Sequence, residues 1–302
     1  MNTVTTSHDV AAQACQCNLC QSERITVLYE LDDFAIVRCQ ECGLVFLSMA
    51  LNADKLSDMY SDNYYKERSD YFQVDVDPDR VVSGEAVDFT NFKNGLALLE
   101  RFRPEKGRLL DVGCALGGFL GLAKQAGWTV TGVDISHYAA EYCRERLGVE
   151  AHSGLLTDIA FADETFDVVT LWDVVEHFEK PVEQLKEVNR ILKTGGWLLV
   201  DTPNERSLIR SVARLIYDIS GGRVDGPLKK LFHQFHLYYF NENTLRRALS
   251  DSGFELVSLQ GRPLPADKGR AGLIGRCIVT LFSWPEKWLG REFELVALAR
   301  KR

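Results

Sequence analysis

One glycine-containing stretch, residues 109–120, constrains the fold of this chain more than any other. It reads Leu-Leu-Asp-Val-Gly-Cys-Ala-Leu-Gly-Gly-Phe-Leu, a short buried strand that runs into a turn and then opens a helix. The glycines permit a tight turn that side chains would obstruct. In open α/β sheets, ligands bind beyond the carboxyl ends of the strands, against such turns and the free N–H groups of the following helix. The stretch therefore predicts an α/β fold with a ligand at this turn.

A second apolar strand, residues 128–133, ends in Asp134, where a carboxylate can accept both hydroxyls of a ribose. These features suit NAD as well as other nucleoside cofactors, so the glycine spacing must decide. It reads Gly-x-x-x-Gly-Gly, not Gly-x-Gly-x-x-Gly, and Asp111 lies two residues before the first glycine. A carboxylate beside the turn repels a pyrophosphate and attracts a cation. S-adenosylmethionine, which carries an ammonium and a sulfonium but no phosphate, therefore fits better than NAD.

At these residues the chain resembles the class I S-adenosylmethionine-dependent methyltransferases. Further stretches are similar to that family's fourth strand and loop, its glycine turn and fifth strand, and its last two strands: residues 165–177, 190–204, 252–257 and 294–301. The resemblance implies a Rossmann-like α/β fold, a seven-stranded, mostly parallel sheet with helices on both faces. Ala115 departs from the family, which more often has glycine there, and this departure puts the local geometry of the turn in doubt.

The resemblance also implies which residues hold the cofactor. The methionine part is expected at Asp111, Gly113 and Gly117, and the ribose and adenine edge at Asp134 and Ile135. Cys114, Leu155 and Trp172 complete the predicted cofactor contacts. The family often has an acid after the third strand that binds the adenine amine, but residues 154–156 read Gly-Leu-Leu here. Backbone groups or Asp158 must then serve that purpose.

Glu176 and His177 follow the fourth strand, at the edge of the sheet where the methyl group of the cofactor is expected. A histidine base suits removal of a proton from an acceptor hydroxyl, with the glutamate orienting the ring. The competing interpretation is an N-cap or surface pair at the start of a helix predicted over 181–192. His236 lies in a stretch similar to the histidine-containing segment that enters the acceptor pocket of related methyltransferases, and it is the second candidate base.

Five of the eight cysteines fall within the first 42 residues. In a reducing compartment, such clustering favours a metal site over disulfides. Two C-x-x-C pairs are separated by 18 residues that contain two strand-like runs, and their cysteines are Cys17, Cys20, Cys39 and Cys42. This layout is typical of a zinc ribbon whose four thiolates fill the coordination shell, so we expect a structural Zn²⁺. Cys15 is an alternative ligand to Cys17, and a redox or metal-free cluster is the alternative to zinc.

These motifs divide the chain into a zinc ribbon at 1–46, a connector with an N-terminal helix at 47–105, and a methyltransferase domain at 106–302. Amphipathic insertions near 204–236 and 262–291 are predicted to form helical lids over the active site. Packing on the core, a dimer interface or contact with a membrane surface are alternatives for their apolar faces. Both a monomer and a homodimer therefore remain open.

The formal net charge of −8 argues against a general nucleic-acid binder. The N-terminus lacks a basic and apolar leader, and no run is long and apolar enough to span a bilayer, which predicts a cytoplasmic protein. The subgroup resembled, with a zinc module and a histidine-rich insertion, implies a small-molecule acceptor: a sugar, a nucleotide sugar or a natural-product intermediate, methylated on oxygen. The alternatives are C- or N-methylation, an RNA or protein methyltransferase that binds its substrate through the zinc module, and a non-catalytic scaffold.

Overall fold

The computed structural model describes residues 16–31, 34–48, 89–232, 236–263 and 285–302. Cys15, most of the predicted connector (49–88) and the apolar part of the second insertion (264–284) lie outside these residues. Within the described residues, no helix combines the length and the apolarity needed to cross a bilayer.

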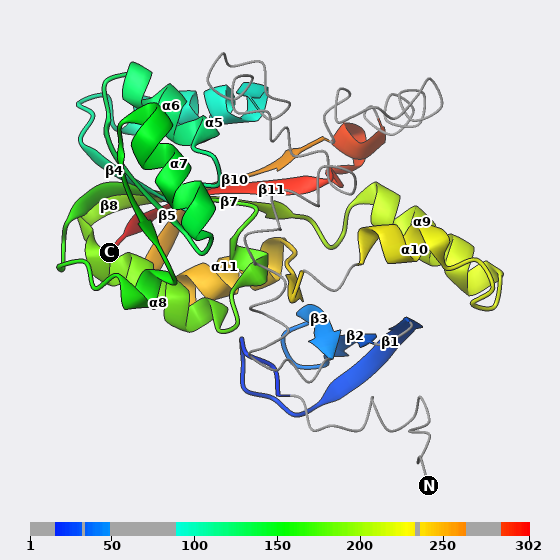
Figure 1. The fold of residues 1–302 in the computed structure, drawn as a ribbon. Helices are drawn as coiled ribbons and strands as arrows, with labels where there is room; N and C mark the ends of the chain where they lie inside the picture. Colours follow the sequence, from blue (N-terminus) through cyan, green and yellow to red (C-terminus); the bar gives the residue numbers. More distant parts are fainter. Residues whose placement is uncertain (1–15, 32–33, 49–88, 233–235, 264–284) are drawn as a thin grey trace, which may run out of the picture.

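A seven-stranded sheet forms the centre of the molecule, as predicted, and its order is β10-β11-β8-β7-β4-β5-β6 (Figure 1). Strands β4 to β8 pair in parallel, whereas β11 lies antiparallel to both β8 and β10. The strands span Arg108–Val112 (β4), Thr129–Asp134 (β5), Glu150–Ser153 (β6), Phe166–Trp172 (β7), Leu192–Pro203 (β8), Phe254–Arg262 (β10) and Glu294–Lys301 (β11). The predicted strands all form, although β8 begins earlier than its pattern indicates.

Helices cover both faces of this sheet, which confirms the predicted fold class (Figure 1). Successive side chains of a strand point to opposite faces, so Leu109 packs under one layer of helices and Leu110 under the other. One layer holds α5 (Phe89–Phe102), α6 (Gly118–Gln125) and α7 (His137–Leu147), and the other holds α8 (Pro181–Ile191) and α11 (Glu242–Asp251).

A second, antiparallel sheet contains the ribbon and has the order β1-β2-β3-β9. Its strands are β1 (Ile25–Leu31), β2 (Phe34–Cys39), β3 (Val45–Ser48) and β9 (Tyr238–Tyr239). Strand β3 extends beyond residue 46, and β9 comes from the insertion after β8, about 190 residues away in the sequence. The ribbon is therefore built into the catalytic domain through a shared sheet.

Both faces of the ribbon sheet are covered. Leu19, Val37 and Phe46 share a buried core with the catalytic domain. The opposite face, which includes Tyr29 and Ile36, packs against α9 (Leu208–Ile219) and α10 (Gly226–Leu231). These two helices thus cover one face of the ribbon sheet, and their predicted role as a lid over the cofactor stays a prediction.

Helix α9 buries the face that carries arginine. Arg210 is 2% exposed and stacks its guanidinium near the rings of Phe232, Tyr239 and Phe293, while Leu215 and Ile219 on the apolar side are 56% and 78% exposed. The guanidinium donates to the carbonyl oxygens of Asn204 and Leu231, at 3.0 and 3.1 Å. Burial lowers the pKa of Arg210 to about 10, so the side chain stays protonated at neutral pH.

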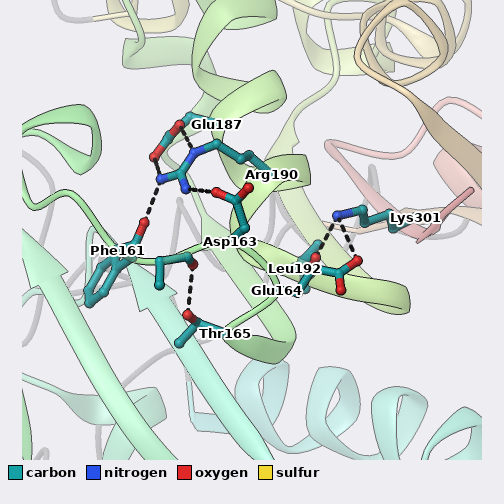
Figure 2. Close-up of polar contacts among 9 residues, drawn as sticks. Phe161, Asp163, Glu164, Thr165, Glu187, Arg190, Leu192 and Lys301 are labelled. Carbon is teal, nitrogen blue, oxygen red and sulfur yellow. Dashed lines mark hydrogen bonds and ion pairs between the residues drawn. The ribbon is translucent and has the colours of Figure 1, made fainter.

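Ion pairs and backbone contacts close the amino edge of the main sheet. Figure 2 shows Arg190 at the end of α8 bound by the carboxylates of Asp163 and Glu187 and donating to the carbonyl oxygen of Phe161. On the neighbouring strand β11, the ammonium of Lys301 donates to the carbonyl oxygen of Leu192 at 2.7 Å. These contacts hold α8 to the turn before β7 and β11 to the start of β8, and the ligand site is expected at the opposite edge.

Candidate active site and cysteine cluster

The carboxyl ends of the parallel strands meet at one edge of the sheet, and the predicted site residues follow these ends. Strand β4 lies between β5 and β7, so the chain order reverses at β4. This reversal is the topological switch point at which open α/β sheets bind ligands. Asp134 ends β5, Trp172 ends β7, and Glu176 and His177 lie in a 3-10 turn, η3 (Val175–His177), just beyond β7.

The turn after β4 takes the conformation that its glycines allow. Gly113 and Gly117 have φ angles of 72° and 79°, in the left-handed region. A Cβ atom at Gly113 would lie 2.3 Å from the side chain of Val174, and one at Gly117 would lie 2.3 Å from Leu147. Gly117 is also the N-cap of α6, so free N–H groups of that helix lie beside the turn.

Asp134 holds this turn in place. One carboxylate oxygen accepts from the backbone N–H of Ala115 at 2.8 Å, and the other accepts from Ser136 at the start of α7, at 2.9 Å. Ala115 has a φ of 48°, so an alanine occupies the left-handed conformation that glycine usually takes. A carboxylate has about four lone-pair positions, which leaves Asp134 able to accept ribose hydroxyls as well.

Asp111 lies under the turn as a buried acid. It is 2% exposed, and its carboxylate accepts a hydrogen bond of 2.6 Å from the hydroxyl of Thr170 on β7. The pKa of Asp111 is raised to about 7, because burial and the nearby charge of Asp134 outweigh the lowering effect of the Thr170 hydrogen bond. A cationic ligand nearby would favour the ionised form.

Three apolar side chains are exposed beyond β5 and β6. Ile135, Tyr138 and Leu155 are 41%, 37% and 50% exposed, and the backbone N–H of Gly154 donates to the backbone carbonyl oxygen of Asp134 across the two strand ends. This apolar floor beside a carboxylate suits a flat aromatic base next to a ribose.

Cys114 and Trp172, also predicted to contact the cofactor, have side chains in the core. Cys114 is 3% exposed and lies against Gly132 of β5, so only its backbone borders the turn. The indole of Trp172 packs against both Phe92 of α5 and Phe119 of α6, with ring-centroid distances of 5.1 Å, and these two rings also touch each other.

Glu176 is not a surface residue. It is 1% exposed, and the hydroxyl of Thr202 on β8 donates to one of its carboxylate oxygens at 2.9 Å. Burial raises the pKa of Glu176 well above its ordinary value, and the charge of Asp173 raises it further. The surface-pair interpretation is therefore wrong for this glutamate, which is suited to hold or share a proton.

Both candidate bases lie beside this carboxyl group. The nearest carboxylate oxygen of Glu176 is 4.0 Å from Nε2 of His236, and the rings of His177 and His236 pack edge to face with centroids 4.7 Å apart. The sequence prediction expected Glu176 to orient His177, but its described ion pair is with His236. The arrangement thus joins two histidines and one buried glutamate in one cluster.

A donor set of this kind could also bind a metal ion. The ligand atoms of Glu176, His177 and His236 lie within 4.8 Å of one another. The Sγ atoms of the four clustered cysteines lie within the same limit, so this spacing allows a shared metal ion as well as a shared proton.

The four predicted metal cysteines are together at the end of the ribbon. The Sγ atoms of Cys17 and Cys42 are 3.5 Å apart, those of Cys20 and Cys39 are 3.4 Å apart, and all four lie within 4.8 Å. A tetrahedral zinc site with Zn–S bonds of about 2.3 Å needs sulfur atoms about 3.8 Å apart, so these residues fit the metal.

Sequence reasoning missed several residues that shape the site. Thr170 and Thr202 supply hydroxyls to the buried acids, and Tyr238 contacts the loop of Glu176 through its hydroxyl. For Thr170 and Thr202, the one sequence signal is a threonine inside an otherwise apolar strand. Tyr238 gives no signal of its own because its partners are distant in sequence.

Comparisons with known proteins agree with this geometry. Residues 88–259 match a family model described as "Methyltransferase domain". A probable S-adenosylmethionine-dependent methyltransferase of Mycolicibacterium smegmatis is 30% identical over 158 residues, which are 51% of this chain and 54% of the relative. A ubiquinone biosynthesis O-methyltransferase of Thiobacillus denitrificans is 32% identical over 164 residues, which are 51% of this chain and 67% of that protein.

Solved structures support the fold alone. An S-adenosylmethionine-dependent methyltransferase from Mesorhizobium loti aligns with a TM-score of 0.50 at 20% identity, over 72% of this chain and 98% of that one. A protein from Pyrococcus horikoshii aligns with the same TM-score at 19% identity, over 80% and 99% of the two chains. The chain spans about half the length of the first curated relatives it matches.

Proposed function

The chain belongs to the class I S-adenosylmethionine-dependent methyltransferases, and we propose that it methylates a hydroxyl of a small molecule with a histidine as general base. The observation that carries the proposal is the cluster of the buried Glu176 with the partly buried His177 and His236, in a loop whose Val174 side chain packs against the turn at Gly113. The turn with its carboxylates suits a cationic nucleoside, and the cluster suits the acceptance of a proton.

When bound, S-adenosylmethionine supplies an electrophilic methyl group on its sulfonium. In this chain, Asp111 would stabilise the ammonium of the methionine part, and Asp134 would accept the ribose hydroxyls. Ile135 and Leu155 would provide an apolar surface for the adenine. Gly113 and Gly117 let the backbone approach the ligand, which aligns the reacting groups and excludes water.

An imidazole nitrogen of His177 would accept the acceptor's hydroxyl proton as the new O–C bond forms. The adjacent His236 and Glu176 would spread the resulting positive charge, since Glu176 lies 4.0 Å from Nε2 of His236. Thr202 fixes the glutamate from β8, so the cluster is held by rigid elements.

The nature of the acceptor is supported by two observations. A relative with 32% identity is named for O-methylation in ubiquinone biosynthesis, which favours oxygen as the methylated atom. Both faces of the ribbon sheet are covered by the rest of the chain, which disfavours the ribbon as a grip for RNA or protein. C- or N-methylation of a small molecule is the alternative that the same base would serve.

Isothermal titration with S-adenosylhomocysteine and with NADH tests the cofactor. We expect one site for S-adenosylhomocysteine and none for NADH, because Asp111 disfavours a pyrophosphate. Failure to bind S-adenosylhomocysteine would remove the proposal. Tritium transfer from labelled cofactor to phenols, nucleotide sugars and amines then identifies the acceptor class, and label on amines alone would contradict O-methylation.

A structural Zn²⁺ at the cysteine cluster is part of the proposal. We expect about one zinc per chain in the purified protein, and Cys17→Ser should lose most of it, because three thiolates cannot complete the tetrahedral shell. Elemental analysis measures the zinc. Cys15→Ser is the matched control and should keep it; zinc lost from Cys15→Ser but kept in Cys17→Ser would reassign the ligand.

Cofactor affinity should depend on pH through Asp111. Its pKa of about 7 means that the empty protein binds a proton there below that pH, and this proton must leave before the carboxylate can stabilise an ammonium. The Kd of S-adenosylhomocysteine is therefore expected to be about tenfold higher at pH 6 than at pH 8. Asp111→Asn should bind weakly with no such slope, whereas a flat profile for the unmodified protein would rule out this role.

A further inference from the structure

The segment that follows His236 joins the ribbon sheet to the loop of the catalytic cluster. The backbone N–H of Leu237 donates to the carbonyl oxygen of Glu176 at 3.0 Å, and its own carbonyl oxygen accepts from Leu47 on β3 at 2.9 Å. The next residue, Tyr238, pairs with Phe46 in the sheet. One residue therefore connects a ribbon strand directly to the backbone of Glu176.

A second connection runs through side chains of the first cysteine pair. Asn18 lies between Cys17 and Cys20, and its amide donates to the hydroxyl of Tyr238 at 2.5 Å and to the carbonyl oxygen of Glu179 at 3.2 Å. The Tyr238 hydroxyl in turn donates to the same carbonyl at 2.8 Å. Tyr238 is 4% exposed, so its hydroxyl is held from the buried side of this triangle, whereas Asn18 and Glu179 lie nearer the surface.

The loop from Asp173 to Lys180 thus has two anchors. At its start, two residues of β8 hold the loop. The carbonyl oxygen of Asp201 accepts from the N–H of Asp173 at 3.0 Å, and the hydroxyl of Thr202 donates to the carboxylate of Glu176. Beyond His177, the described side-chain contacts to the carbonyl of Glu179 come from Asn18 and Tyr238. The ribbon therefore fixes the half of the loop that follows the candidate base.

We propose that Asn18 and Tyr238 are positioning residues for methyl transfer, which clamp the Glu176–His177 loop to the first cysteine pair of the ribbon. This inference rests on the proposed function of that loop. Through these two residues the ribbon sets the position of the candidate base. Displacement of a catalytic group by about 1 Å is enough to lower turnover strongly.

The test compares Tyr238→Phe and Asn18→Ala with Gln40→Ala. Gln40 occupies the second cysteine pair as Asn18 occupies the first, but its side chain donates to Thr26 within the ribbon. For the first two variants we expect kcat to fall about tenfold and amide exchange over residues 173–180 to rise, with the Kd of S-adenosylhomocysteine and the zinc content unchanged. Gln40→Ala should match the unmodified protein in all four measurements.

Exchange and activity separate the two proposals. If the protein transfers no methyl group but exchange over residues 173–180 still rises in Tyr238→Phe and Asn18→Ala, the clamp exists and the proposed function fails. If methyl transfer occurs and both variants leave kcat and loop exchange unchanged, the clamp is wrong. An equal loss of kcat in Gln40→Ala would also overturn the clamp, because any substitution in the ribbon would then lower kcat.

Discussion

Replacing His177 by alanine is expected to lower kcat about 100-fold or more, while the Kd of S-adenosylhomocysteine changes less than about twofold. The physical reason is the separation of the two parts of the site. Apart from Trp172, whose ring packs in the core, the cofactor contacts are predicted at β4, β5 and β6, whereas His177 lies beyond β7, beside a buried carboxyl group that can share a proton. Removing the ring takes away a proton acceptor without touching the cofactor floor.

Two further variants make this result specific. His236→Ala tests the second histidine of the cluster, and His152→Ala is the matched control. His152 also pairs with a glutamate, at 3.0 Å from Glu150, but this pair lies on the edge strand β6 and is partly exposed. Normal turnover in His177→Ala together with a large loss in His236→Ala would transfer the role of base to His236. Normal turnover in both would end the general-base mechanism.

The catalytic core could be predicted from sequence because its signals are local. Helix α7 is bounded by two local signals: Ser136 caps its start by accepting from the N–H of Ala139, and Gly148 ends it in a left-handed conformation. The parallel strands are short apolar runs bounded by turns, and their order follows from the family resemblance. Such features need no contact between distant residues.

The attachment of the ribbon could not be predicted in the same way. Strand β9 has two residues, Tyr238 and Tyr239, and it forms because β3 provides an edge about 190 residues earlier. A two-residue strand has no detectable period. Helix α9 was also misleading, because the apolar residues of its last turns are exposed and Arg210 is buried by stacking and by two carbonyl oxygens. Tertiary contacts decide both cases.

At Ala115 local propensity fails at the functional turn itself. A left-handed φ costs a residue with a Cβ about 1–2 kcal/mol, so sequence alone argues against it. The structure adopts it because Asp134 accepts from the N–H of Ala115 and thereby holds the turn. A strained residue held by a buried carboxylate is typical of a site organised for a ligand.

That contact leads to the second large effect: Asp134→Ala is expected to weaken S-adenosylhomocysteine binding about 100-fold or more. The substitution would remove a charged acceptor for two ribose hydroxyls, each worth about 1.5–3 kcal/mol, and would also leave the N–H groups of Ala115 and Ser136 without their carboxylate. Isothermal titration measures the loss of affinity, and thermal unfolding of the ligand-free protein measures the loss of stability.

The double variant Asp134→Ala with Ala115→Gly separates these two causes. Glycine adopts a positive φ without strain, so it should restore much of the turn's stability while leaving the ribose without an acceptor. We therefore expect the thermal midpoint to recover and the affinity to stay low. Recovery of affinity as well would mean that Asp134 acts only by holding the turn, and the ribose would then have to be bound by other groups at the ends of β5 and β6.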